Sequence, residues 1–164
     1  MTTSLLTPDT VSWIGRALPT HIHEVGRSDI AKFAHAIGAQ DPAHFDVEAA
    51  WDRGFSDCVA PLGYYVAIRL AAPNLTALGE LGADGVATTG IPPSAATKVM
   101  AGTTRARFHR RIVAGDVITL ECAITDITEK AGRSGPLILV TYLYRYLDSN
   151  GGLVVEENYS RVLR

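Results

Sequence analysis

A histidine and an aspartate lie three residues apart in a short segment and could together perform acid–base chemistry. Residues 39–46 read Ala-Gln-Asp-Pro-Ala-His-Phe-Asp, which places Asp41 before Pro42 and His44 two residues later. The ordinary pKa of histidine lies close to neutral, so His44 is a candidate general base. Asp41 is a candidate catalytic carboxylate, although an aspartate before a proline is also typical of a turn that caps its own backbone. The segment therefore predicts proton transfer at His44 and leaves both roles open for Asp41.

The other residues that could bind a metal or react through sulfur are poorly placed for it. Cys58 and Cys122 are far apart in the sequence and form no C-x-x-C pair, so we expect two buried thiols. His21 and His23 are two apart on a predicted strand and would face the same side of it. No carboxylate at an obvious spacing completes a metal site around them. We therefore expect neither a metal nor a bound cofactor.

Composition and charge exclude several classes of protein. The 164-residue chain carries 15 basic and 17 acidic side chains, a formal net charge of −2. Its length fits one domain over residues 1–164, and its charge argues against a nucleic-acid partner. Apolar stretches are shorter than the roughly 20 residues of a membrane helix, so we expect no membrane association. The first residues do not resemble a secretion signal, so a cytoplasmic location is expected.

The first half of the chain has helical patterns. A short strand is predicted over residues 20–26, followed by a helix that begins with Ser28 as its N-cap. Apolar residues recur at helical spacing up to Gly38, a residue typical of a helix C-terminus. A further helical turn is predicted over residues 48–51, ending near Gly54. These elements must position the loop that carries His44.

An apolar helix is predicted over residues 61–72. It starts at Pro61, which is favourable in a first helical turn, and Pro73 is expected to end it. Because the segment is apolar almost all round, we expect this helix to be buried. Residues 74–97 are rich in Gly, Ala, Thr and Pro without a sustained period, which predicts a long loop excursion.

The second half of the chain is typical of β structure. Strand-length segments rich in Val, Ile, Thr and Tyr occur at residues 103–109, 117–127, 137–147 and 153–163. With the early strand they predict an α+β domain, in which a mostly antiparallel five-stranded sheet wraps around the apolar helix. The edges of such a sheet are exposed, so we expect pairing between protomers and at least a dimer.

Four segments of the sequence resemble the MaoC-like hot-dog family, in the branch called the N-terminal half of MaoC dehydratase. This branch includes (3R)-hydroxyacyl-ACP dehydratase subunits. The segments are Phe33-Ala34-His35-Ala36-Ile37-Gly38, Asp41-Pro42-Ala43-His44, Val59-Ala60-Pro61-Leu62 and Phe108-His109-Arg110-Arg111-Ile112-Val113-Ala114-Gly115-Asp116. In the last segment Arg111 stands where the family usually has proline. The resemblance implies a hot-dog fold and an acyl-thioester substrate carried on CoA or on the phosphopantetheine of an acyl carrier protein.

The resemblance also implies catalytic residues, of which this chain keeps only some. Catalytic members of the family have an aspartate and a histidine in a G-D-x-N-P-L-H loop. His44 takes the histidine place, Ala39 stands at the aspartate place, and Asp41 stands at the asparagine place. Alanine cannot transfer a proton, and the loss of one acid–base group commonly costs about 10² to 10⁴ in rate. Asp41 could replace the missing group, a partner protomer could supply it, or His44 could act alone.

The binding residues implied by the resemblance lie around the start of the apolar helix. In the family a backbone amide at this place holds the thioester carbonyl oxygen, and Leu62 and Gly63 correspond by spacing. Free amides and the positive helix end would stabilise an oxyanion. Arg27 is a candidate contact for a substrate carboxylate or for phosphopantetheine, although a solvated arginine at a helix start is an alternative. Tyr64 and Tyr65 are core candidates, one of which could line an acyl tunnel.

Three functions are compatible with these residues. The resemblance implies an enzyme that adds water to an enoyl thioester or removes it from a 3-hydroxyacyl thioester. The missing aspartate favours a thioesterase, with or without addition of an amine to the enoyl chain, because attack at the carbonyl needs only a base and an oxyanion hole. The third possibility is a non-catalytic subunit of a heterodimer whose partner has the complete pair, so the predicted assembly is either a homodimer or such a heterodimer.

Overall fold

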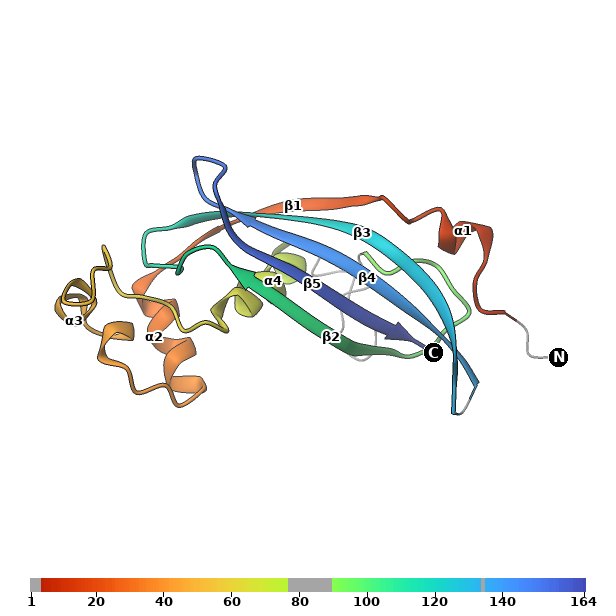
Figure 1. The fold of residues 1–164 in the computed structure, drawn as a ribbon, viewed down its shortest axis with the longest axis horizontal. Coiled ribbons are helices and arrows are strands. Elements are labelled where there is room, and N and C mark those ends of the chain that lie inside the picture. The colour runs from red at the N-terminus through yellow and green to blue at the C-terminus, as the bar shows by residue number, and fades with distance from the viewer. Residues whose placement is uncertain (1–3, 77–89, 134) are drawn as a thin grey trace.

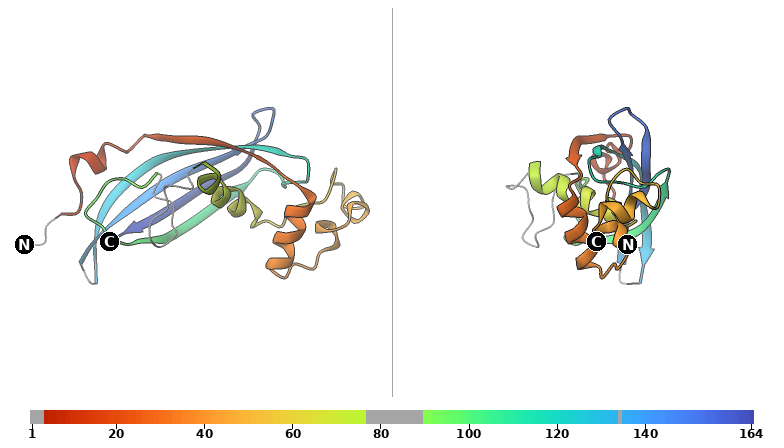
Figure 2. Two further views of the ribbon diagram at one scale, coloured as in Figure 1. Left: turned by 180° about the vertical axis from the view of Figure 1, so that it is seen from behind. Right: turned by 90° about the vertical axis from the view of Figure 1, so that its left-hand side faces the viewer.

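The computed structural model describes residues 4–76, 90–133 and 135–164. Within these ranges, five antiparallel strands form one sheet in the order β1-β3-β4-β5-β2. The strands are β1 Ala17–Glu24, β2 Val99–Phe108, β3 Val117–Gly132, β4 Gly135–Leu147 and β5 Leu153–Leu163. The sheet curves around the helix α4 (Tyr64–Thr76), as Figures 1 and 2 show. The predicted α+β architecture of five strands around a central helix is confirmed.

The two long strands β3 and β4 are rich in apolar residues and bury alternate side chains. In β3 and β4 every second side chain is buried over most of the length, which directs one face of the sheet to α4. The buried side chains of these two strands include Ile118, Leu120, Cys122, Ile124, Ile138, Val140, Tyr142, Tyr144 and Tyr146. They join Tyr64, Tyr65 and Ile68 of α4 in one hydrophobic core. The core therefore holds α4 against the concave face of the sheet.

Short helices lie beyond one end of the sheet, where they carry the predicted acid–base loop (Figure 1). They are α2 (Arg27–Ala36), the 3-10 helix η1 (Pro42–His44) and α3 (Val47–Trp51). The short helix α1 (Pro8–Val11) precedes the sheet and had not been predicted. Thr7 caps it through a hydrogen bond from the Thr10 amide at 3.1 Å, a local signal that could have been read from the sequence.

Three predicted helix boundaries differ in the structure. Gly26, not Ser28, is the N-cap of α2, because the Gly26 carbonyl accepts from Ile30 and starts the helical bonding earlier. Helix α4 starts at Tyr64 rather than at Pro61, whose carbonyl accepts the Tyr64 amide in a preceding turn at 2.9 Å. The helix also continues through Pro73, because packing of the preceding turns on the sheet can outweigh one lost backbone hydrogen bond. The predicted end of α2 at Gly38 is confirmed by its positive φ of 70°.

Only part of the predicted loop over residues 74–97 lies within the residues that the structure describes. Residues 74–76 belong to α4, so the predicted start of the loop was wrong, and residues 90–98 form neither helix nor strand. The rest of the predicted loop lies outside the described residues.

The prediction that the apolar helix is buried all round is wrong at Leu70, whose side chain is 57% exposed. Its neighbour Arg69 is buried, because it pairs with Glu157 of β5 under the sheet. One side of α4 therefore lies uncovered by the described part of the chain. None of the helices in that part is long and apolar enough to cross a bilayer.

Candidate active site

His44 ends the 3-10 helix η1 and is buried, with 6% of its surface exposed. Asp41 caps this helix by accepting the Ala43 amide at 3.0 Å, which is the turn-forming role that its place before a proline indicated. The Ala43 carbonyl in turn accepts the Val59 amide at 2.9 Å. The imidazole is therefore held on a short, capped turn that is bonded to the segment leading into α4.

One nitrogen of the His44 ring is committed to this segment. Its Nδ1 lies 2.6 Å from the carbonyl oxygen of Val59. A carbonyl can only accept, so Nδ1 carries the proton and donates it to this bond. In the neutral ring the lone pair is then on Nε2, the nitrogen that can act as a base. The backbone of Val59 therefore orients the ring, a role that a carboxylate often performs.

The segment around Val59 that orients His44 is also hydrogen-bonded to residues 111 and 112. The Ala60 amide donates to the carbonyl of Ile112 at 2.8 Å, and the Arg111 Nη2 donates to the carbonyl of Ala60 at 2.8 Å. Arg111, the residue at the place where the family usually has proline, thus holds the chain between Val59 and α4. Hydrogen bonds therefore connect the histidine to the segment that leads into the helix.

Leu62 and Gly63 lie at the end of this segment, immediately before the first residue of α4. Leu62 is 52% exposed, and neither backbone amide donates to an acceptor among the residues that the structure describes. Val59, whose carbonyl anchors His44, is three residues from Leu62, a separation that spans at most about 10 Å of extended chain. Amides at a helix start favour a negative oxygen. The ring of His44 is thus bonded to the segment whose end carries the backbone amides of Leu62 and Gly63.

Asp41 is engaged in contacts other than with the His44 ring. Its carboxylate forms an ion pair with Arg53 and a backbone hydrogen bond with Ala43. The Ala43 amide, followed by Arg53, holds the pKa of Asp41 below its ordinary value. A low pKa suits a carboxylate that stays charged in a cap and makes it a weak base.

We predict that Asp41→Asn keeps most of the activity. Asparagine caps helix starts about as well as aspartate, so the turn that carries His44 should persist. The ion pair with Arg53 is exposed and contributes at most about 1 kcal/mol to stability. A decrease in kcat/KM of less than about fivefold, well below the 10² expected for a lost acid–base group, is therefore expected. A decrease of that larger size, with an unchanged circular dichroism spectrum, would instead make Asp41 the substitute for the missing family aspartate.

Arg27, the first residue of α2, is hydrogen-bonded to Asp57 in the segment that precedes Val59. Its Nε and Nη2 each donate to the Asp57 carboxylate at 2.8 Å, and Asp57 also accepts the Cys58 amide at 2.6 Å. The bond from Arg27 is the main reason that the pKa of Asp57 lies below its ordinary value. The Arg27 side chain is 61% exposed, so it can still be reached from solvent. Any contact with a substrate would share the guanidinium with Asp57.

Tyr64 and Tyr65 are both buried beside the two amides. The Tyr64 hydroxyl lies 3.3 Å from Nε2 of His23, and burial raises the pKa of Tyr64 to about 12. The Tyr65 ring contacts Phe108 and Tyr146 edge to face. Both tyrosines therefore have the packing contacts of core residues. His21 and His23, with ring centres 6.3 Å apart, are not joined by a third ligand in the described part of the chain.

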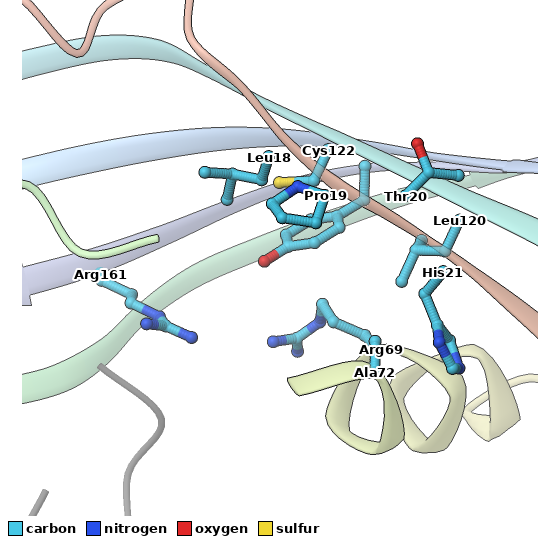
Figure 3. Close-up of a pocket in the computed structure, with 10 residues that line it drawn as sticks. Leu18, Pro19, Thr20, His21, Arg69, Ala72, Leu120, Cys122 and Arg161 are labelled. Atoms are coloured by element: carbon cyan, nitrogen blue, oxygen red, sulfur yellow. The ribbon is translucent and has the colours of Figure 1, made fainter. Parts of the chain in front are cut away.

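A cavity with charged side chains in its wall lies between α4 and the sheet, and it was not predicted from the sequence. Arg69 and Arg161 line it together with His21 (Figure 3). One signal was present, since Arg69 is the single charged residue in an otherwise apolar helical segment over residues 61–72. A buried arginine needs a partner, and the structure supplies Glu157.

Comparisons with known proteins agree with this architecture. Residues 12–157 match the family described as FAS1-like, dehydratase domain region. A UPF0336 protein of Clavibacter michiganensis subsp. michiganensis is 30% identical over 152 residues, which cover 92% of this chain and 92% of that protein.

Two solved structures have the same fold. The HadBC (3R-hydroxyacyl-ACP dehydratase) complex from Mycobacterium tuberculosis superposes with a TM-score of 0.67 at 22% identity, covering 92% of this chain and 96% of its own. A MaoC-like dehydratase from Rhodospirillum rubrum gives a TM-score of 0.66 at 23% identity and covers 92% and 91%. The sheet around α4 is thus the MaoC-like hot-dog fold, and the chain belongs to the FAS1-like dehydratase domain family.

Proposed function

We propose that this protein adds water to 2-enoyl thioesters, or removes it from 3-hydroxyacyl thioesters, with His44 as the base. One observation carries the proposal: the Val59 carbonyl holds Nδ1 of His44 three residues before Leu62, and the Leu62 and Gly63 amides donate to no acceptor among the described residues. The substrate would be carried on CoA or on acyl carrier protein, and the reaction needs no further cofactor. The family and the fold support this class of chemistry.

Hydration can proceed through one base. Nε2 of His44 takes a proton from water as the oxygen forms a bond to C3 of the enoyl chain. The C2–C3 π electrons move toward the thioester carbonyl, whose oxygen becomes negative and accepts hydrogen bonds from Leu62 and Gly63. The imidazolium then returns its proton to C2, which completes the 3-hydroxyacyl product. Dehydration is the reverse sequence, and neither direction needs a carboxylate at Ala39.

Product analysis tests this proposal directly. The purified protein is incubated with a short trans-2-enoyl thioester, with and without glycine, and the products are separated by mass spectrometry. A thioester one water heavier than the substrate is expected. A free acid as the first product would instead identify a thioesterase, and a glycine adduct would identify amine addition. Either result contradicts hydration.

A non-catalytic role in a heterodimer is the second candidate, favoured by Ala39 at the family's aspartate place. The HadBC and ChsH1-ChsH2 structures, both of this fold, are complexes of two different chains. For this candidate, turnover would be absent with the chain alone and would appear only after a MaoC-like partner with the complete pair is added. Substitution of His44 would then leave the activity of the mixture unchanged.

We predict that the chain alone forms a dimer. The strands β1 and β2 are the two edges of the sheet, and Leu70 of α4 is exposed. Unpaired edges and exposed apolar residues favour association with a second protomer. Multi-angle light scattering should therefore give twice the chain mass of 17.5 kDa. A monomer at micromolar concentration would contradict the homodimer and would favour the heterodimeric candidate.

A further inference from the structure

A cavity of about 80 Å³ lies between α4 and the sheet, separate from His44 and from the Leu62 and Gly63 amides. Its walls come from β1, α4, β3, β4 and β5. Leu18, Pro19, Ala72 and Leu120 supply apolar surface, and Arg69, Arg161 and His21 supply nitrogen donors. The cavity therefore combines an aliphatic wall with a cationic one.

Arg69 is nine-tenths buried and has an unsatisfied donor. Its side chain is 9% exposed, and its Nε lies 3.2 Å from the Glu157 carboxylate in a geometry that is not a hydrogen bond. Its guanidinium carbon lies 4.1 Å from the centre of the Tyr159 ring, which holds the group in place. Glu157 thus balances the charge of Arg69, but the Nε of Arg69 has no hydrogen-bond acceptor.

Arg161 reaches the cavity from β5 without a carboxylate partner in the described part of the chain. Its Nη1 is completely buried and has no hydrogen-bond acceptor, and the buried Nε2 of His21 likewise has no hydrogen-bond partner. Figure 3 shows the guanidinium groups of Arg69 and Arg161 pointing toward one another across the cavity. A buried donor without an acceptor is energetically costly, so an acceptor placed between the two guanidinium groups would be favoured.

The charges indicate which acceptor fits. Arg69 is paired with Glu157, whereas Arg161 has no carboxylate partner among the described residues, which leaves one positive charge to be matched. A carboxylate carries a single negative charge and two oxygens that suit guanidinium forks. The apolar wall formed by Leu18, Pro19 and Leu120 suits the aliphatic part of the same molecule. A phosphate dianion would match neither the charge nor that wall.

We propose that this cavity binds the carboxylate of an aliphatic acid, held between Arg69 and Arg161. The acid can be free, or it can be the distal carboxylate of a dicarboxylic acyl thioester. Only the second source rests on the proposed hydratase function, since binding of a free acid requires no turnover.

Calorimetric binding to the full chain tests the proposal with free ligands. Hexanoate is expected to bind, and hexanamide, which has the same shape without the charge, should bind at least about tenfold more weakly. Arg161→Gln should weaken hexanoate binding by a similar factor, because it removes one of the two guanidinium groups. The matched control is Arg145→Gln, an arginine of β4 that pairs with Glu121 on the surface and should leave hexanoate binding unchanged.

A thioester arm identifies the source of the carboxylate. If the substrate supplies it, adipoyl-CoA should bind at least about tenfold tighter than hexanoyl-CoA, with the preference lost in Arg161→Gln. If a free acid is the ligand, hexanoate binds and the two thioesters do not differ. Equal binding of hexanoate and hexanamide, or tighter binding of inorganic phosphate, would overturn the proposal. The comparison of hexanoate with hexanamide uses only the wild-type chain, so it tests the proposal even if Arg161→Gln does not fold. Because it measures binding, it does not depend on the activity of His44.

Discussion

Replacement of His44 by asparagine is expected to lower kcat/KM for hydration of a 2-enoyl thioester by about 10² to 10⁴. The asparagine side-chain amide can occupy the place of the ring Nδ1 and donate to the Val59 carbonyl, the bond that is 2.6 Å long in the wild type. What the variant lacks is Nε2, the nitrogen that takes the proton. The change therefore removes the base while it keeps the anchor.

Comparison with a second histidine isolates the chemical effect. His35→Asn alters an exposed histidine of α2 whose ring centre lies 4.6 Å from that of Phe45, near the same turn. It should change kcat/KM by less than about threefold, because surface substitutions usually cost little. Initial rates over a range of thioester concentrations measure both variants. If His44→Asn keeps full activity, His44 is a structural residue and the proposed mechanism fails.

Replacement of Glu157 by leucine is expected to destabilise the fold by about 3–5 kcal/mol. Glu157 is fully buried and accepts a hydrogen bond from the Tyr146 hydroxyl at 2.9 Å while it pairs with Arg69. Its loss leaves the Arg69 charge buried without a counter-charge. Urea unfolding followed by circular dichroism measures the change in the free energy of unfolding.

The double variant Arg69→Met, Glu157→Leu tests whether the attraction between Arg69 and Glu157 exceeds the free-energy cost of burying both charges. Burial raises the pKa of Glu157 even though Arg69 opposes the effect, so the carboxylate is held there at an energetic cost. Removing both charges should therefore restore the free energy of unfolding to the wild-type value or above it. As a control, Glu121→Gln breaks an exposed pair with Arg145 and should cost at most about 1 kcal/mol. A single Glu157→Leu variant as stable as the wild type would show that Arg69 does not need its partner.

The raised pKa of Glu157 also sets the sign of its pH effect. A carboxyl group with a raised folded-state pKa stabilises the fold below its unfolded pKa, and this contribution is lost as the pH rises through the folded value. Wild-type stability attributable to Glu157 should therefore fall on going from acidic to neutral pH, and the double variant should lack this component.

Local patterns in the sequence determined the main elements of this protein. Segments rich in Val, Ile, Thr and Tyr predicted β3, β4 and β5, and the apolar run before Pro73 predicted α4. These predictions succeed because neighbouring residues decide which face of a strand or helix is apolar. The errors lie at helix ends such as Ser28 and Pro73, where contacts with the rest of the chain compete with local preference.

The residues of the candidate site were proposed from short segments of the sequence. His44 and the amides of Leu62 and Gly63 were identified from the resemblance, and the capping role of Asp41 from its place before a proline. No pattern indicated that the Val59 carbonyl would orient the His44 ring. That bond depends on how the turn around His44 packs against the segment before α4, which is a matter of tertiary structure.

The tertiary structure alone decided the partners of the charged residues. Arg27 with Asp57, Arg69 with Glu157, and Arg69 facing Arg161 each join elements that are distant in the chain. Such contacts depend on strand register and on the rotation of α4 over the sheet, and neither leaves a periodic signal in the sequence. Local patterns therefore indicated most of the elements and the groups that could react, whereas packing decided which charges are paired, which buried donors lack an acceptor, and which nitrogen of the His44 ring is bonded to the backbone.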